Sequence, residues 1–166
     1  MLSIACLFIL TGCPAGEGRQ AAATPQVSAL ATYRTDIAEL GELITLPALP
    51  VEARWQIAPK GVSGSAIGPT DYDLVAVLTF DAAALQVLQS QWQEQDSPPE
   101  LLIAKEFMQP WFAPVLEPLV TVDPAFPAFL RLTGTRYEPM PFAKNSLRDG
   151  YVLVRDNQVF IYLFTT

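Results

Sequence analysis

Residues 71–80, which read DYDLVAVLTF, constrain the fold most. The five residues at the centre of this segment, 74–78, are all apolar, so no polar face is left to meet water. A strand of this kind has to be covered on both sides by other parts of the chain. The segment therefore predicts the central strand of the sheet, covered on both sides by packed layers.

Two further regions have the pattern of strands. Residues 51–57 alternate between apolar and polar side chains, which is typical of a half-buried strand. Near the C-terminus, the apolar segments 151–155 and 158–164 are separated by Asp156 and Asn157. Asp and Asn tolerate the positive φ angles of tight turns, so we expect a C-terminal β-hairpin.

Three segments have helical features. Residues 27–40 carry apolar side chains at spacings of three and four and are followed by Gly41, which predicts an amphipathic helix ending there. Asp81 is placed to cap a second helix over residues 82–92. Residues 97–100, Ser-Pro-Pro-Glu, form a capping box with proline at the first helical position, and they predict a third helix over residues 101–111.

Residues 111–130 are strongly apolar but contain four prolines. Proline removes a backbone donor, so neither a long helix nor a central strand is compatible with this segment. We expect a meandering segment with short turns, followed by a strand over residues 130–137. Together these patterns predict one α+β domain, residues 27–166, with an antiparallel or mixed sheet, helices on one face and a C-terminal β-hairpin.

The N-terminus reads MLSIACLFILTGCPAGEG, in which a short apolar run leads into Leu10, Thr11, Gly12 and Cys13. This motif resembles the lipobox of bacterial lipoproteins. The resemblance covers only this segment and implies that residues 1–12 are a signal peptide, and that Cys13 becomes the lipid-modified first residue of the mature protein. Residues 13–26 are then a flexible tether with a reach of roughly 20 Å.

The lipobox implies a membrane as one partner, reached through the lipid on Cys13. It also implies a location in the bacterial cell envelope, facing the periplasm. Pro14 follows Cys13 where inner-membrane lipoproteins commonly have Asp, which slightly favours the outer membrane. An alternative interpretation is that residues 2–10 form a buried strand or helix and that Cys13 is an ordinary core thiol.

Several classes of chemistry are disfavoured by composition. The chain has no histidine, which removes Ser-His-Asp and Cys-His catalysis and most zinc or copper sites. Cys6 lies in the leader and Cys13 would be acylated, so we expect no disulfide, metal or cofactor. The net charge of −7 and the scattered basic residues argue against nucleic-acid binding.

One candidate ligand or partner loop lies between the two predicted strands and contains Ser63, Ser65, Asp71 and Asp73. Asp71 and Asp73 are two residues apart on one strand, so their side chains share a face and could act as acid and base or hold a cation. No dinucleotide or Walker motif is present in this glycine-bearing loop. We favour the simpler interpretation, an ordinary strand connection rich in turn-forming residues.

A candidate apolar partner surface lies in residues 107–130 and is represented by Trp111, Phe112, Phe126 and Phe129. Aromatic residues are enriched at the centres of protein interfaces. Large apolar runs are also typical of cores, and we expect much of this segment to be buried.

These features lead to three functional hypotheses. We favour a non-enzymatic envelope lipoprotein that binds another protein, for example an immunity or inhibitor protein. The second hypothesis is a hydrolase or metal-dependent enzyme that uses Asp71 and Asp73. The third is a structural or assembly lipoprotein of the envelope.

Overall fold

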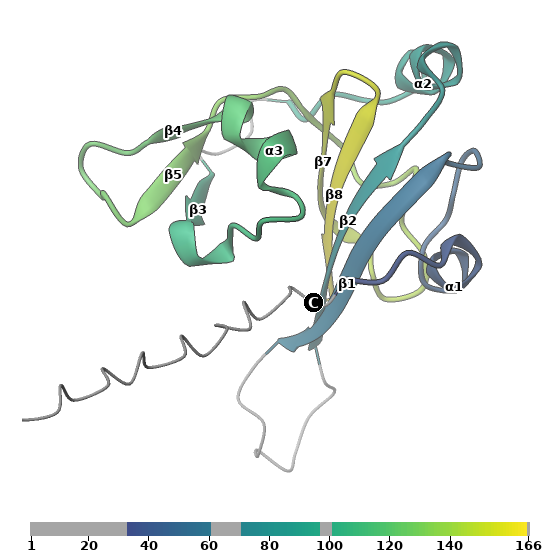
Figure 1. Cartoon of the computed structure of the whole chain (residues 1–166), viewed down its shortest axis with the longest axis horizontal. Coiled ribbons are helices and arrows are strands. Elements are labelled where there is room, and N and C mark those ends of the chain that lie inside the picture. Colours follow the sequence, from purple (N-terminus) through teal and green to yellow (C-terminus); the bar gives the residue numbers. More distant parts are fainter. Residues whose placement is uncertain (1–32, 61–70, 97–100, 166) are drawn as a thin grey trace, which may run out of the picture.

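The computed structural model describes residues 33–60, 71–96 and 101–165, and these form an α+β domain with two antiparallel sheets (Figure 1). The larger sheet has five strands in the order β1-β2-β8-β7-β6. Its strands are β1 (Glu52–Lys60), β2 (Asp71–Thr79), β6 (Arg136–Tyr137), β7 (Asp149–Arg155) and β8 (Gln158–Phe164). The smaller sheet, in the order β3-β5-β4, consists of β3 (Leu102–Ala104), β4 (Val120–Val122) and β5 (Phe129–Leu132).

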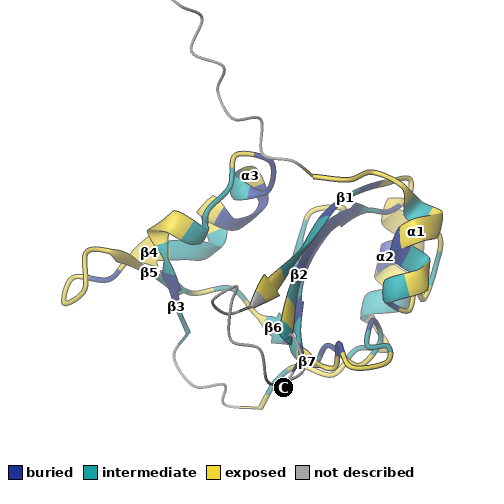
Figure 2. Ribbon diagram, turned by 90° about the horizontal axis from the view of Figure 1, so that it is seen from below, coloured by how far each residue is buried: buried dark blue, intermediate teal, exposed yellow. Residues whose placement is uncertain are grey.

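The large sheet is covered on both faces, as residues 71–80 predict. On one face, α1 (Ile37–Leu43) and α2 (Ala82–Gln89) pack against residues such as Trp55, Leu74 and Ile161. On the other face, Val75, Val77 and Phe160 pack against residues 111–116. Figure 2 shows these layers, with the two longer helices on one side of the sheet and the small sheet and α3 on the other.

The second layer contains short elements. They are the 3-10 turns η1 (Lys105–Phe107) and η2 (Glu117–Leu119), the one-turn helix α3 (Ala113–Leu116) and the small sheet. The two longer helices share one face of the large sheet as expected, while α3 lies on the opposite face. This proline-rich region is a meander of short elements, as the sequence predicts.

The helix expected over residues 101–111 is wrong. Residues 102–104 form β3, which pairs with residues 129–131 of β5, and η1 follows. The apolar spacing is helical, but pairing with a distant strand satisfies the same backbone groups and places Ile103 in a buried position. The capping-box residues 97–100 lie outside the described residues.

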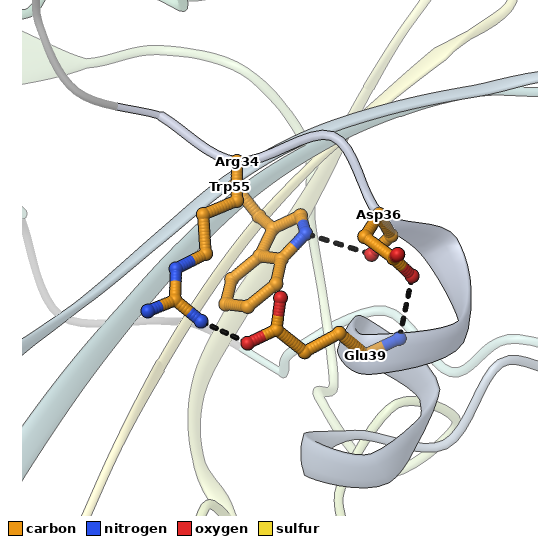
Figure 3. A network of polar contacts seen from close by, with 4 residues as sticks. All are labelled: Arg34, Asp36, Glu39 and Trp55. Atoms are coloured by element: carbon orange, nitrogen blue, oxygen red, sulfur yellow. Dashed lines mark hydrogen bonds and ion pairs between the residues drawn. The ribbon is translucent and has the colours of Figure 1, made fainter.

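The helix expected over residues 27–40 is not continuous through the described residues, because residues 33–36 precede α1 as extended chain that joins the edge of the large sheet; residues 27–32 lie outside the described residues. The backbone of Arg34 exchanges two hydrogen bonds with Trp55, at 2.7 and 2.9 Å. Asp36 then caps α1 by accepting a hydrogen bond from the Glu39 N–H (2.8 Å), and its carbonyl accepts one from Trp55 Nε1 (3.0 Å). Figure 3 shows this junction, where Arg34 also pairs with Glu39 and lies over the Trp55 ring. The helix continues through Gly41 to Leu43, so Gly41 does not end it.

The remaining elements follow the predictions more closely. The C-terminal hairpin is confirmed, and Asp156 in its turn has φ 55°. Asp81 caps α2 through the Ala83 and Ala84 N–H groups, although α2 ends at Gln89. Strand β2 is an interior strand, but β8 occupies the centre of the sheet. The strand expected over residues 130–137 is divided between β5 and β6, which belong to different sheets.

Gly150 provides a test of the hairpin geometry. Its φ is +141°, and a Cβ atom there would lie 1.9 Å from the carbonyl oxygen of Tyr162. We expect Gly150→Ala to lower the free energy of unfolding by at least about 2 kcal/mol, because the backbone must shift to relieve the clash. Urea unfolding followed by circular dichroism measures the loss.

Gly41→Ala is the matched control for this experiment. Gly41 is helical, and its added Cβ would meet Leu46 Cδ1 at an ordinary 3.5 Å. We expect this variant to gain about 0.5 to 1 kcal/mol from the higher helix propensity of alanine. Equal unfolding midpoints for Gly150→Ala and the unsubstituted chain would contradict the strained geometry at Gly150.

Candidate functional site

Asp71 and Asp73 lie at the start of β2, where the sequence places them, and Ser63 and Ser65 lie outside the described residues. The carboxylate of Asp71 accepts a hydrogen bond from the Thr165 hydroxyl at 3.2 Å. The same hydroxyl accepts one from the Tyr72 N–H (2.8 Å), and the Thr165 N–H donates to the Tyr72 carbonyl (3.0 Å). Asp71 therefore helps to fasten the end of the chain to the start of β2.

Asp73 has a different environment, because it lines a hollow of about 200 Å³ between the large sheet and residues 107–112. Its carboxylate is hydrogen-bonded to the hydroxyl of Tyr162, on the neighbouring strand β8. The hollow has polar amides as well as apolar walls, and its lining residues are Gln56, Ala58, Asp73, Val75, Phe107, Gln109 and Phe112. Asp73 thus provides a hydrogen-bond acceptor inside a partly aromatic pocket.

A second hollow, of about 250 Å³, adjoins the first at Phe107. Tyr151 and Tyr162 form its floor on the large sheet, and residues 101–104 form the opposite wall. The Phe107 ring lies edge-on to Tyr162, with ring centroids 5.7 Å apart. We call the two hollows together the Asp73 cleft.

The two tyrosine hydroxyls of the cleft are weaker acids than ordinary tyrosines. The pKa of Tyr162 rises from its ordinary value of 10.0 to about 12, first because the ring is partly buried and then because the Asp73 carboxylate repels a tyrosinate charge and is hydrogen-bonded to the hydroxyl. Burial also raises the pKa of Tyr151, and its proximity to Tyr162 adds to the rise. The Tyr162 hydroxyl, which is hydrogen-bonded to Asp73, therefore keeps its proton to a higher pH than an ordinary tyrosine.

Residues 107–112, which form the wall of the first hollow opposite the large sheet, are held to that sheet by polar and aromatic contacts. Arg54 on β1 donates a hydrogen bond from Nη1 to the Trp111 carbonyl oxygen, at 3.1 Å. Phe112 packs against Phe160 and Phe107, with ring centroids 5.6 and 5.3 Å apart. These contacts hold the two walls at a fixed spacing.

The four residues of the candidate apolar surface do not form one surface. Trp111 and Phe112 are buried in the core between the large sheet and α3, with 5% and 1% of their surface exposed. Phe126 and Phe129 are 57% and 37% exposed and lie beyond β4 and at the start of β5. The sequence does not show which pair is buried and which is exposed, because both pairs lie in the same apolar, proline-containing segment.

Sequence reasoning selects Asp73 but misses Tyr151, Tyr162, Gln56 and Gln109. Alternation along β8 places Tyr162 on the same face as Phe160, and the hairpin turn at Asp156 sets Tyr151 opposite Tyr162. That pairing is a signal in the sequence. The pairing of β2 with β8, which brings Tyr162 beside Asp73, joins segments about 90 residues apart and has no local signal.

Comparison with protein-family models, curated proteins and solved structures finds no match for this chain. Among the described residues, no group of three or more acidic, histidine or cysteine side chains is arranged to hold a metal ion. Within residues 33–60, 71–96 and 101–165, no helix is long and apolar enough to cross a membrane. The proposed function therefore rests on the geometry of the cleft and on the N-terminal motif.

The contact between Asp73 and Tyr162 predicts a shift in a measurable titration. The folded state holds the Tyr162 proton more tightly than the unfolded state. The contribution of this proton to the free energy of unfolding is therefore fully present below pH 10.0 and is lost as the pH rises to about 12. In Asp73→Asn we expect the pKa of Tyr162 to fall but to stay above 10.0, because the charge is removed while the burial remains. The pKa of Tyr162 is measured by tyrosinate absorbance during a pH titration, after subtraction of the titration of the matching chain that also carries Tyr162→Phe.

Asp71→Asn is the control, because the Asp71 carboxylate is hydrogen-bonded to Thr165, whereas the shift at Tyr162 comes from burial and from Asp73. An equal shift in both variants would mean that the Asp73 carboxylate does not act directly on Tyr162.

Proposed function

We propose that this chain is a lipid-anchored, non-enzymatic protein of the bacterial cell envelope whose α+β domain binds another protein at the Asp73 cleft. The observation that carries the proposal is the pair of hollows on either side of Phe107, one with a carboxylate and amides and the other with two tyrosines. An immunity or inhibitor protein that captures an incoming toxin or hydrolase is one concrete form of this function.

The size of the hollows favours a protein segment as the ligand. Pockets for complete small-molecule ligands are about 300 to 1,000 Å³, whereas each hollow alone measures about 200 or 250 Å³ and the Phe107 ring lies between them. Each is suited to one anchoring side chain of a partner, and such anchors carry most of the binding energy in protein interfaces. Two adjacent hollows separated by one ring suit two neighbouring side chains of a partner segment.

The chemistry of the two hollows indicates which side chains would fit. Phe107, Tyr151 and Tyr162 surround the second hollow and favour an apolar or aromatic group. In the first hollow, Asp73 accepts hydrogen bonds and favours a basic or hydroxyl group. The net charge of −7 adds a general preference for a basic partner surface.

The carboxylates themselves support binding over catalysis. Asp71 is engaged by Thr165 and Asp73 by Tyr162, so the two side chains are held by different hydroxyls. A hydrolase that uses both groups needs them to share a substrate or a proton. The lack of histidine in the sequence removes the most common general base as an additional helper.

The envelope part of the proposal rests on Leu10, Thr11, Gly12 and Cys13, which lie outside the described residues. Mass spectrometry of the mature N-terminus tests it directly. We expect a mature chain that starts at Cys13 and carries acyl chains. We also expect Cys13→Ser to release the protein from the membrane fraction, because the substitution removes the acyl chains that anchor it. An unmodified Cys13 in the membrane-bound protein would refute the anchor.

A photo-crosslinking amino acid at Gln109 tests the binding site. We expect it to capture one partner protein in intact cells, while the same group at Val87, which is exposed on α2 across the large sheet, captures none. Ala58→Phe fills the first hollow, and we expect it to weaken partner binding by about 30-fold, the equivalent of about 2 kcal/mol, as the loss of a central anchor does.

Gly41→Ala serves as the folded control for Ala58→Phe, since it lies in α1 on the other face of the sheet. Capture of the same protein with equal yield from positions 87 and 109 would place the interface elsewhere on the domain.

A further inference from the structure

The turn between β4 and β5 consists of a buried aspartate, Asp123, followed by exposed apolar residues. Residues 124–129 read Pro-Ala-Phe twice, and all six are exposed. Val122 precedes the turn and is 55% exposed, compared with 57% for Phe126 and 37% for Phe129. Figures 1 and 2 show this turn projecting from the small sheet, away from the large sheet and its helices. We call residues 120–132 the arm and residues 124–129 its tip.

Three of the four backbone N–H groups of the tip donate hydrogen bonds within the arm. Asp123 accepts hydrogen bonds at Oδ1 from the N–H groups of Ala125 (2.7 Å) and Phe126 (3.0 Å). The Asp123 N–H donates to the Phe129 carbonyl (3.2 Å), and the Phe129 N–H donates to the Phe126 carbonyl (2.8 Å). Pro124 and Pro127 have no N–H group. Six of the seven positions from 123 to 129 therefore present no open backbone donor.

The only charge in the turn is neutralised and turned inward. The Asp123 side chain is 2% exposed, and its Oδ2 lies 2.6 Å from Nη2 of Arg131 on β5. The Arg131 side chain remains 39% exposed at the base of the tip. An exposed apolar turn in which all but one of the backbone donors are paired or absent, and whose single carboxylate is paired, loses fewer hydrogen bonds when it leaves water.

These properties fit a lipid surface better than a protein surface. Aromatic side chains bury about 150 to 250 Å² each, so the exposed part of the tip amounts to a few hundred Å². A stable protein interface takes about 800 Å² from each partner. A bilayer has no such minimum area, because a few apolar side chains inserted beside an existing anchor add to its hold. Arg131 lies where it would reach lipid phosphates.

We propose that the tip of the arm inserts into the boundary between the headgroups and acyl chains of a phospholipid bilayer. The insertion is shallow, about 5 to 10 Å, the depth at which apolar side chains of interfacial segments are buried. The arm then orients the domain on the membrane and leaves the Asp73 cleft, on the large sheet, available to a protein partner. This proposal rests on the arm and on the proposed lipid anchor, and not on the partner of the cleft.

Depth-dependent fluorescence quenching tests the insertion. The full chain carrying Phe126→Trp is reconstituted into vesicles of phosphatidylcholine and phosphatidylethanolamine, with and without bromine on the acyl chains. We expect bromine to remove about half or more of the emission added by the introduced indole, because that ring lies at acyl-chain depth. The native tryptophans are subtracted with the unsubstituted chain.

Val87→Trp is the matched control, since Val87 is 60% exposed but lies on α2, across the large sheet. We expect its added emission to be the same with brominated and ordinary lipid. Equal quenching at positions 87 and 126, or none at 126, would overturn the proposal. So would a blue shift of the Phe126→Trp emission that depends on protein concentration in the absence of vesicles, because that result identifies a second copy of the chain as the occupant.

Hydrogen exchange on the unsubstituted chain keeps the test independent of any folding defect in the variant. We expect vesicles to slow exchange in residues 124–129 by at least about tenfold and to leave α2 unchanged, because only the tip enters the interface. Unchanged exchange in the tip would also overturn the proposal. Replacing both Phe126 and Phe129 with Ser should abolish the slowing, while the Val87→Ser chain should retain it.

Discussion

Burial of the large sheet on both faces is the constraint on which the rest of the structure depends. Leu74, Ala76 and Leu78 point to the helical side, and Val75 and Val77 point to the other. Helices α1 and α2 can cover only one of these faces, so a second layer is required. The chain supplies it from its proline-rich region, which forms short turns and a small sheet instead of another helix. This second layer provides one wall of the cleft and the whole of the arm.

The sequence predicts elements whose determinants are local. Asp81 caps α2, residues 51–57 alternate, and Asp156 with Asn157 forms the hairpin turn, because in each case the deciding residues are near neighbours. The helix expected over residues 101–111 fails for the opposite reason. Its apolar spacing is helical, but residues 102–104 find hydrogen-bonding partners in β5, more than 20 positions away, and tertiary pairing overrides a weak local preference.

The residues of the candidate site also differ in whether a local sequence signal identifies them. Asp73 can be selected from the sequence because a carboxylate at the start of an apolar strand stands out locally. Its partner Tyr162 cannot, since their proximity depends on the pairing of β2 with β8 and on the register of that pair. The apolar candidates divide as well. Trp111 and Phe112 are drawn into the core by Phe160 and Phe107, whereas Phe126 and Phe129 lie beyond the reach of the large sheet.

The geometry of the second layer explains why an apolar tip remains exposed. The small sheet contacts the large sheet through residues such as Leu101, Leu119 and Leu132, which lie near its ends and connections. Strands β4 and β5 extend away from that contact, so Phe126 and Phe129 gain no burial from the fold. Folding stability alone gives no reason for aromatic side chains there, because exposed apolar groups contribute little to a core and favour aggregation. The paired N–H groups of the turn and the inward carboxylate of Asp123 are also more than a water-facing turn requires. A lipid surface accounts for the exposed rings and the satisfied polar groups together, since apolar side chains are favoured there and unpaired polar groups are not.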